Sequence, residues 1–549
     1  ADKACLQIRM LNRGKGAAVH SLRGQEDKFR YHALMKQTLE NTPNLRILQG
    51  EATAILTENG KTAGILTAYG SAVFAPAVVL ATGVYLNGSV IAGEWKKSAG
   101  PNGFAAANDL TANLLDLGFS VRRFKTGTPP RVNARSVDFT KMQVQEGDAE
   151  PEPFSFGTEQ VPENRARCYL TYTTPETHEI IRANLDRSPL YSGVIEGVGP
   201  RYCPSIETKV MTFPDKERHQ LFIEPMGLGT EELYVQGFSS SMPEEVQVQM
   251  LHSVPGLEHA EIMRAAYAIE YDCVDPLELL PTLETRKVSG LYGAGQFNGS
   301  SGYEEAAVQG FAAGVNAALK ILGRPPFVLK RSEAYIGALI DDLVTRGTNE
   351  PYRMMTSRSE YRLLLRQDNA DERLTHIGYE LGLVSKERLD KVNAKYAAVD
   401  AEIARLEHTH VAPTPELCAA LSRLGTAAPA SGVSLAALLR RPQVGYADLA
   451  PFDRDRPGLP RAVTQQVEIR LRYEGYIKRQ LKQVEEFARM ENRALPADID
   501  YEKVPGLRTE ARQKLAALRP ESFGRASRIS GVSPADMAAL AMYIGRAGR

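Results

Sequence analysis

Glycines are concentrated between residues 291 and 310, where the chain reads Leu-Tyr-Gly-Ala-Gly-Gln-Phe-Asn-Gly-Ser-Ser-Gly-Tyr-Glu-Glu-Ala-Ala-Val-Gln-Gly. The pattern predicts a strand ending at Gly293, a loop with Gly295, Asn298 and Gly299, and a helix over residues 304–322. Glycines let backbone N–H groups approach a ligand, and a helix start adds unpaired donors and partial positive charge. This stretch indicates a site for an anion or an electron-rich ring, although any strand–turn–helix connection would share its pattern.

A second strand end of the same kind lies at residues 77–83, which read Ala-Val-Val-Leu-Ala-Thr-Gly. A continuous apolar run of this length is typical of a strand buried on both faces of a parallel sheet. Small residues at its carboxyl end leave space for a cofactor in the crevice above the sheet. Two such strand ends, far apart in the chain, predict a discontinuous, Rossmann-like α/β domain of the kind found in flavoproteins.

The third element of that fold is a Gly-x-Gly-x-x-Gly turn after the first strand. Residues 1–12 contain no such turn, and residue 1 is Ala rather than Met. We therefore expect that this chain lacks the first βαβ unit of the domain. The helix of that unit normally binds the cofactor pyrophosphate, so we also expect cofactor retention to be weakened.

Cys203 lies in a short segment that reads Gly-Val-Gly-Pro-Arg-Tyr-Cys-Pro-Ser over residues 197–205. Two glycines and two prolines predict a rigid, irregular loop. Neighbouring cations such as Arg201 and Lys209 would lower the pKa of the thiol and favour a nucleophilic thiolate. The alternative is a small buried hydrophobe, the commoner role of cysteine and the one we expect for Cys168 and Cys273.

A second rigid loop is predicted over residues 125–131, which read Lys-Thr-Gly-Thr-Pro-Pro-Arg. The cations at its two ends, Lys125 and Arg131, suit a phosphate, a carboxylate or the negative charge of a reduced flavin. A surface turn is the alternative, although the double proline restricts the backbone strongly. Lys125, Arg201 and Cys203 are therefore the candidate catalytic residues.

Arginine alternates with tyrosine over residues 350–366, where Arg358 and Arg362 flank Tyr361 and Tyr352 lies upstream. Arginine forks and tyrosine faces suit contact with single-stranded RNA, and they equally suit an ion-paired helix between domains. Basic residues also dominate residues 9–30 and residues 501–549, where nine Lys and Arg face four Asp and Glu. We take Arg358, Arg362, Arg525 and Arg528 as candidate RNA-binding residues, with solvated surface charge as the alternative.

Changes in amino-acid composition and in the expected secondary structure along the chain predict four segments. Residues 1–125 form the first part of the α/β domain, with a helix near residues 27–41, a strand near residues 45–49 and a hairpin at residues 58–61. Residues 126–269, rich in prolines and aromatics, form an inserted β-rich domain, and residues 270–327 return to the α/β domain. Residues 328–549 form an all-helical domain.

Within the helical domain, Ser385 is a predicted N-cap for a helix with apolar residues at helical spacing. Residues 411–460, rich in Ala, Ser and Pro, are expected to be a loosely packed connector. Ser533 and Pro534 are expected to open the final helix as N-cap and N1 residues.

The composition is that of an ordinary globular protein, with 549 residues, 43% apolar and 24% charged residues, and zero net charge. No apolar run reaches membrane-spanning length. The five scattered cysteines form no Cys-x-x-Cys pair, which argues against a disulfide framework or a metal site and favours a reducing compartment.

Several long motifs of the chain closely resemble the MnmG (GidA) family of tRNA uridine 5-carboxymethylaminomethyl modification enzymes. They are Gly-Val-Gly-Pro-Arg-Tyr-Cys-Pro-Ser-Ile-Glu from Gly197, Glu-Pro-Tyr-Arg-Met-Met-Thr-Ser-Arg from Glu350, and Tyr-Glu-Gly-Tyr-Ile-Lys-Arg-Gln from Tyr473. The resemblance implies a cytoplasmic homodimer that uses FAD and NADH. It also implies a partner GTPase of the MnmE type, in a heterotetramer, and modification of carbon 5 of the wobble uridine in tRNA with methylene-tetrahydrofolate as one-carbon donor.

The resemblance also implies roles for individual residues. Cys203 matches the cysteine proposed to add to the uracil ring, Gln296 matches an FAD contact, and Ala52 and Ala107 fall at further FAD positions. The implied nicotinamide-binding stretch consists of Gly199, Pro200, Arg201, Tyr202, Cys203, Pro204, Ser205, Ile206, Glu207, Thr208, Lys209, Val210, Met211, Thr212 and Phe213.

Two rival functions stay open at this stage. One is a folate- and FAD-dependent tRNA uridine methyltransferase, a related flavoprotein class. The other is a catalytically inactive module that binds tRNA or the GTPase. The long helical domain and the Tyr-Glu-Gly-Tyr-Ile motif favour the modification enzyme over the methyltransferase.

Overall fold

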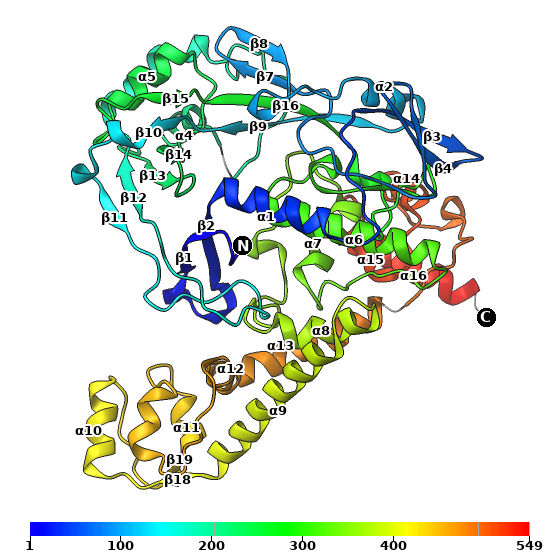
Figure 1. The fold of residues 1–549 in the computed structure, drawn as a ribbon. Coiled ribbons are helices and arrows are strands. Elements are labelled where there is room, and N and C mark those ends of the chain that lie inside the picture. The colour runs from blue at the N-terminus through cyan, green and yellow to red at the C-terminus, as the bar shows by residue number, and fades with distance from the viewer. Residues whose placement is uncertain (203, 492, 548–549) are drawn as a thin grey trace.

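The computed structural model describes residues 1–202, 204–491 and 493–547. Figure 1 shows a body of strands and helices, a helical arm below it (residues 370–491), and a C-terminal helical module at its side (residues 493–547). This arrangement confirms the predicted fold class, an α/β domain with an inserted β-rich domain and a helical C-terminal part. None of the helices in the described residues is both long enough and apolar enough to span a membrane.

The two predicted strand ends lie side by side. β6 (Val78–Leu80) and β17 (Leu291–Gly293) pair in parallel, with Leu80 opposite Gly293. The strands are shorter than predicted, but α6 (Tyr303–Ile321) follows the glycine-rich loop as expected. The parallel pairing brings both small-residue segments to the same edge of the α/β domain.

A four-stranded antiparallel sheet joins the α/β domain to the inserted domain. Its order is β8 (Trp95–Ser98), β7 (Ser89–Ala92), β16 (Tyr267–Val274) and β9 (Val121–Thr128). β9 and β16 pair without interruption from Val121 opposite Val274 to Thr128 opposite Tyr267. The predicted domain boundaries after residues 125 and 269 fall inside these two strands, and the division itself stays a prediction.

The inserted domain contains a six-stranded antiparallel sheet whose order is β11-β12-β13-β14-β10-β15. The strands are β10 (Arg131–Asn133), β11 (Gln143–Gln145), β12 (Cys168–Tyr172), β13 (Gln220–Pro225), β14 (Glu232–Gln236) and β15 (Ile262–Arg264). Its helices are α3 (Pro175–Ala183), α4 (Ile206–Thr212) and α5 (Glu244–His252). They enclose a core that includes Ile206, Val235 and Met250, each with no exposed surface.

The N-terminal part begins with a hairpin of β1 (Cys5–Leu11) and β2 (Ser21–Glu26), followed by α1 (Lys28–Glu40). Asp27 caps α1, and the predicted hairpin forms between β3 (Ala52–Glu58) and β4 (Lys61–Thr67), with β5 (Ala72–Phe74) beside it. α2 (Asp109–Asp116) packs on β3. The helix predicted near residues 27–41 and the hairpin predicted at residues 58–61 are therefore confirmed.

The strand expected near residues 45–49 is wrong. These residues form no strand, and Leu45, Ile47 and Leu48 are 44%, 52% and 76% exposed. An apolar run becomes a strand only where a neighbouring strand accepts and donates its backbone hydrogen bonds. The residues that the structure describes provide no such neighbour at this place.

The arm consists of α8 (Ala370–Glu380), α9 (Lys386–His408), α10 (Pro415–Arg423), α11 (Leu435–Leu439), α12 (Arg461–Arg472) and α13 (Glu474–Glu491), with β18 (His410–Val411) and β19 (Val433–Ser434) between them. Ser385 caps α9 as predicted, by accepting the N–H of Arg388. The expected loose connector over residues 411–460 is wrong, because its leucines, among them Leu421 and Leu438, are buried and pack with residues of α9 in one hydrophobic core. Because Ala, Ser and Pro are so frequent in this segment, the helical spacing of its leucines was not recognised from the sequence.

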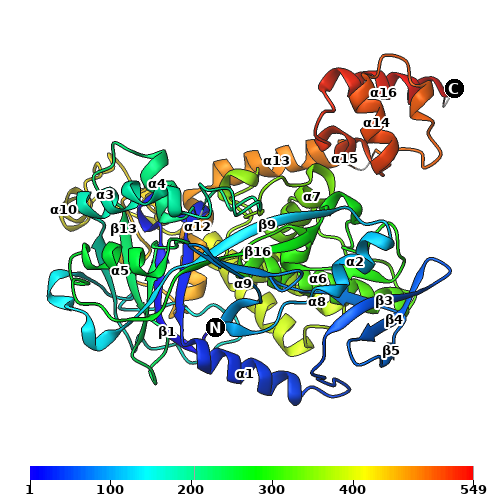
Figure 2. The ribbon, with the colours of Figure 1, turned by 90° about the horizontal axis from the view of Figure 1, so that it is seen from above.

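The C-terminal module contains α14 (Thr509–Leu518), α15 (Phe523–Arg528) and α16 (Pro534–Ala547) around a core of its own. Ser533 and Pro534 open α16 as predicted. Figure 2 shows α13 running from the arm to this module. α15 also contacts α7 (Tyr335–Arg346), the helix that follows the α/β domain.

Tyr352 connects α7 to the glycine-rich loop. Its backbone N–H donates to the carbonyl of Gly299, and its carbonyl accepts the N–H of Ser301 at 2.7 Å. Its ring is 1% exposed, and its hydroxyl donates to Asp342 of α7 at 2.8 Å. The loop is therefore held by backbone bonds to a residue whose side chain is itself fixed.

We predict that Tyr352→Phe lowers the free energy of unfolding by about 1 to 3 kcal/mol, because it leaves a buried carboxylate oxygen without its donor. Urea unfolding measures the change. Tyr303→Phe is the matched control, because Tyr303 is 89% exposed, and it should change stability by less than about 0.5 kcal/mol. Equal effects of the two substitutions would contradict the role of the Tyr352 hydroxyl.

Candidate functional site

We call the glycine-rich loop between β17 and α6 the glycine nest (residues 293–302). Gly295, Gly299 and Gly302 have φ angles of 69°, 75° and 101°, in the left-handed region that other residues avoid. A Cβ atom on Gly302 would also overlap the carboxylate of Glu305. The glycines that the sequence singled out are therefore required by the backbone itself.

The nest is almost closed to solvent. Gly293, Gly295, Asn298 and Gly299 are buried, whereas Gln296, the predicted FAD contact, is partly exposed. The Asn298 amide donates to Gln309 at 2.9 Å, but its Oδ1 atom is buried without a partner.

A second unpartnered atom lies just beyond β6, where the Thr82 hydroxyl is also buried. Two orphaned polar atoms follow the ends of the two paired strands, a feature that suits a polar ring ligand with hydrogen-bonding groups.

The negative charge of Glu305, in the first turn of α6, determines which kind of ligand can bind at the start of this helix. Its Oε1 atom accepts the backbone N–H of Met354 at 2.9 Å and faces the Arg353 guanidinium at 3.2 Å. Its Oε2 atom is buried without a hydrogen-bond partner. A carboxylate in the first turn offsets the positive end of the helix, so this end favours a ring system over a phosphate.

The second loop of the site (residues 197–202, the site loop) lies along the free edge of β9. The backbone N–H of Lys125 donates to the carbonyl of Val198 at 3.0 Å. Gly199 lies so close that a Cβ atom there would be 2.8 Å from Cε of Lys125. Lys125 is only 7% exposed, so its ammonium group is held beside this loop rather than in solvent.

Both loops meet at β9. A Cβ atom on Gly299 would lie 3.3 Å from the ring of Phe124, while Gly199 packs against Lys125. Because neighbouring residues of a strand point to opposite faces, one dipeptide contacts the nest on one side and the site loop on the other. The two segments thus contact adjacent residues of one strand from its opposite faces.

The rigid loop predicted over residues 125–131 is shorter than expected. Lys125 and Thr128 belong to β9, and Arg131 begins β10, so only Pro129 and Pro130 lie between strands. Arg131 donates to the Thr128 hydroxyl and the Pro129 carbonyl at 2.9 and 2.8 Å. The surface-turn alternative is wrong, because both Lys125 and Arg131 are buried.

The residues of the predicted nicotinamide-binding stretch differ in how far they are exposed to solvent. Cys203 lies outside the described residues. Gly199 and Pro200 are half-buried, Arg201 and Tyr202 are exposed, Pro204 is half-buried, and Ser205 caps α4 by accepting the N–H of Thr208.

In α4, Ile206 and Val210 belong to the core, and Glu207 is fully buried, where it accepts from Ser240 at 2.7 Å and Ser241 at 3.0 Å. Lys209 donates to the Gly237 carbonyl at 2.8 Å. Met211, Thr212 and Phe213 are exposed. The residues before α4 and those at its end are therefore the ones that a ligand can reach, and the nicotinamide role stays a prediction.

The two alanines predicted at FAD positions lie at different places. Ala107 is bonded to the segment that follows β6, since its N–H donates to Tyr85 at 2.9 Å and its carbonyl accepts from Asn87. Ala52 begins β3, opposite Thr67. Ala107 is thus beside the strand ends, and both assignments remain predictions.

The arginine–tyrosine segment is mostly buried. Tyr352, Tyr361 and Arg366 are 1%, 6% and 4% exposed, so these rings cannot stack on RNA bases. The Arg358 guanidinium packs 4.4 Å from the centre of the Tyr352 ring, and Arg362 is exposed. The interdomain alternative fits most of this segment, although its only helical turn among the described residues is a short 3-10 helix (Thr356–Arg358). Arg358 and Arg362 remain candidates for RNA contact.

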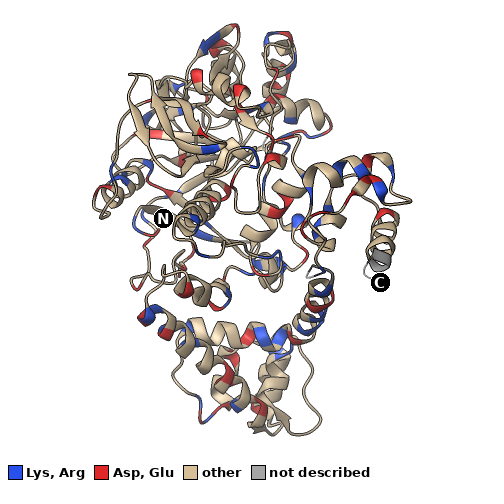
Figure 3. Ribbon diagram, turned by 90° about the vertical axis from the view of Figure 1, so that its right-hand side faces the viewer, with Lys and Arg blue, Asp and Glu red and all other residues tan. Residues whose placement is uncertain are grey.

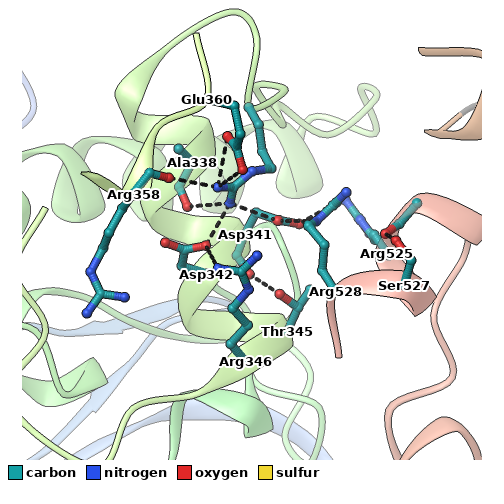
Figure 4. Close-up of polar contacts among 12 residues, drawn as sticks. Ala338, Asp341, Asp342, Thr345, Arg346, Arg358, Glu360, Arg525, Ser527 and Arg528 are labelled. Atoms are coloured by element: carbon teal, nitrogen blue, oxygen red, sulfur yellow. Dashed lines mark hydrogen bonds and ion pairs between the residues drawn. The ribbon is translucent and has the colours of Figure 1, made fainter. Parts of the chain in front are cut away.

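Arg528 has a structural partner. Its Nε and Nη2 atoms donate to the two carboxylate oxygens of Asp341 in α7 at 2.7 and 3.0 Å, and both side chains are nearly buried (Figure 4). Asp341 also faces Arg331 at 3.1 Å. This bidentate pair ties the C-terminal module to α7. Arg525 is different, because its partner Glu521 is largely exposed.

Positively and negatively charged residues are mixed along the described part of the chain. Lys and Arg are interspersed with Asp and Glu on most elements (Figure 3). Local docking of a polyanion therefore depends on individual exposed cations rather than on a uniformly basic surface.

Sequence reasoning missed Thr82 and Tyr352 as parts of the site. Thr82 carried a signal, since it is the polar residue at the end of an apolar run. Tyr352 was noticed only as an aromatic face, because no local pattern reveals that its backbone pairs with Gly299 and Ser301.

We predict that Arg528→Ala lowers the free energy of unfolding of the C-terminal module by about 2 to 3 kcal/mol, because a nearly buried carboxylate loses one partner. Arg525→Ala should cost less than about 1 kcal/mol, because its ion pair is exposed to solvent. Urea unfolding of the two variants measures both values. A cost for Arg525→Ala as large as that for Arg528→Ala would contradict this assignment.

We predict that three cysteines resist alkylation in the native protein. Burial raises the pKa of Cys5 and Cys168 to about 11 and that of Cys273 to about 12. At pH 8 their thiolate fraction is therefore far below that of a free thiol, and burial also blocks the reagent. Mass spectrometry after iodoacetamide treatment measures this, with Cys418 as the half-buried reference. Native Cys273 reacting as fast as it does in urea would contradict the prediction.

Comparisons with known proteins place the chain in a family. Residues 1–325 match the family described as glucose inhibited division protein A. Residues 386–481 and 483–549 match the C-terminal helical domain and helical bundle of the tRNA modifying enzyme MnmG/GidA. The first of these matches covers more than half of the chain.

Full-length relatives agree. The tRNA uridine 5-carboxymethylaminomethyl modification enzyme MnmG of Caldicellulosiruptor saccharolyticus is 56% identical, covering 100% of this chain and 87% of the relative. The enzyme of that name from Geobacillus thermodenitrificans is 53% identical, covering 99% and 86%. The solved structure of Aquifex aeolicus GidA matches with a TM-score of 0.90 and 44% identity, covering 99% of this chain and 87% of that one. The chain therefore belongs to the GidA family.

Proposed function

We propose that this chain is a flavin-dependent tRNA-modifying enzyme that acts on the wobble uridine. The finer proposal is that it adds a carboxymethylaminomethyl or aminomethyl group to carbon 5, with FAD, NADH and methylene-tetrahydrofolate. The observation that supports the proposal is that the glycine nest and the site loop contact adjacent residues of β9. The chain is also 56% identical over 547 residues to a tRNA uridine 5-carboxymethylaminomethyl modification enzyme.

The glycine nest would hold the flavin ring. Its left-handed glycines shape the backbone, in which the N–H of Gly299 already donates to the carbonyl of Gln296 at 2.9 Å, and the unpartnered atoms of Asn298 and Thr82 suit the polar edge of the ring. Gln296 is the partly exposed side chain that would contact it. A bound flavin supplies the transfer of reducing equivalents between NADH and the one-carbon unit.

The residue that follows the site loop in the sequence, Cys203, would be the nucleophile. In the proposed reaction, the thiolate of Cys203 adds to carbon 6 of the uracil, forming an S–C bond and making carbon 5 nucleophilic. Carbon 5 then attacks the one-carbon unit, carried as an iminium of glycine or ammonia, and the C=N π bond opens to the amine as the new C–C bond forms. Loss of the proton from carbon 5 breaks the S–C bond and restores the thiolate. Arg201 and the buried Lys125 would stabilise negative charge on the sulfur.

The remaining parts of the proposal concern partners. We propose that the arm and the C-terminal module bind tRNA and an MnmE-type GTPase, in a heterotetramer built on a homodimer in the cytoplasm. The matches of residues 386–481 and 483–549 to helical domains of MnmG/GidA support this. The same matches favour the modification enzyme over the methyltransferase.

We predict that Cys203→Ser abolishes modification of the wobble uridine while leaving flavin absorbance of the purified protein unchanged. The reason is that serine lacks the nucleophilic thiolate but fits the same backbone. Nucleoside analysis of reacted tRNA measures the product, and Cys418→Ser, in α10, is the matched control. Normal modification by Cys203→Ser would remove that residue from the reaction. A protein that shows no flavin spectrum with added FAD but still binds tRNA would favour the inactive binding module.

A further inference from the structure

Glu270 is a carboxylate in the middle of β16, where only 1% of its surface is exposed. A carboxylate withdrawn from water needs hydrogen bonds that replace its hydration. Its Oε1 atom accepts two, from the backbone N–H of Glu196 at 2.7 Å and from that of Gly197 at 2.6 Å. Glu270 therefore ties the start of the site loop to the sheet.

Gly197 fits this contact so closely that no side chain is possible there. A Cβ atom would lie 2.9 Å from the backbone of Phe124 and 3.2 Å from Oε1 of Glu270. Just before it, Ile195 packs with Ala268 on the same face of β16. Steric fit and hydrogen bonding thus fix the same short segment independently.

Glu270 also lies directly opposite Lys125 in the β9–β16 pair, so both side chains are on one face of the sheet. Its Oε2 atom faces Lys96 at 3.6 Å and Arg123 at 3.7 Å, without a hydrogen bond to either. The carboxylate is therefore shared between the site loop and a group of cations. One side chain sets the position of the loop relative to Lys125.

We infer that Glu270 is a positioning residue for the proposed reaction: it holds residues 196–199 on the edge of β9 and so keeps the site loop beside Lys125. The inference rests on the proposed function, which assigns the nucleophile to Cys203, the next residue in the sequence after this loop. Glu270 acts through the backbone of the loop and does not touch the substrate.

Hydrogen exchange tests the structural part of this inference without any activity. In the full protein, Glu270→Ala removes the oxygen that accepts both N–H groups, so amide exchange in peptides covering residues 196–202 should accelerate by at least about 10-fold. Glu270→Gln keeps one carbonyl oxygen in place and should stay within about 3-fold of the parent. Glu402→Gln is the control, because Glu402 is an equally buried carboxylate in the arm.

Kinetics test the functional part. Displacement of the loop should lower kcat for wobble-uridine modification by about 100-fold in Glu270→Ala, while KM for an unmodified tRNA transcript stays within about 3-fold. Gly197→Ala should reproduce this split, since it pushes the loop off β9. Gly229→Ala is its control, because a Cβ atom there meets nothing within 4 Å. A purely structural role of Glu270 would instead lower flavin content and raise KM together with the loss of kcat.

The inference and the proposed function fail in different assays. Unchanged exchange of residues 196–202 in Glu270→Ala would overturn the inference, and so would accelerated exchange with unchanged kcat. Loss of the exchange protection together with kcat, and recovery of both in Glu270→Gln, would support it. If the parent protein loaded with FAD does not modify the wobble uridine, the proposed function fails, whatever the exchange data on Glu270. Modification by Cys203→Ser at the parent rate would remove only the assignment of the nucleophile.

Discussion

The antiparallel pairing of β9 with β16 is the constraint on which the candidate site depends. It fixes Phe124 and Lys125 on opposite faces of one strand, where Phe124 contacts Gly299 of the nest and Lys125 contacts Gly199 of the site loop. The same pairing puts Glu270 opposite Lys125. A shift of the pair by one residue would exchange the two faces of β9 and break the contacts of Phe124 with the nest and of Lys125 with the site loop.

Much of the fold could be predicted because its signals are local. Apolar runs ending in small residues identified β6 and β17, and a serine before a periodic stretch identified the start of α9. The strand expected near residues 45–49 failed because strand formation needs a neighbour that the run itself does not encode. Residues 411–460 were misjudged because the Ala, Ser and Pro content concealed leucines at helical spacing.

The candidate site was predictable in its parts but not in its assembly. Glycine spacing located the nest, and cations beside a proline-rich stretch located Lys125. The bonds of Tyr352 to Gly299 and of Glu270 to Gly197 join residues far apart in sequence, and no single-sequence pattern reports them. Arg528 shows the same limit, since its charge suggested RNA while its position pairs it with Asp341.

The most direct test of the account is a crystal structure of the protein with FAD bound. We expect the flavin ring to lie against the backbone of the glycine nest, with Gln296 and the unpartnered atoms of Asn298 and Thr82 at its polar edge and the site loop at the edge of β9 beside Lys125. A flavin ring bound away from the nest, or a site loop displaced from the edge of β9, would contradict the account.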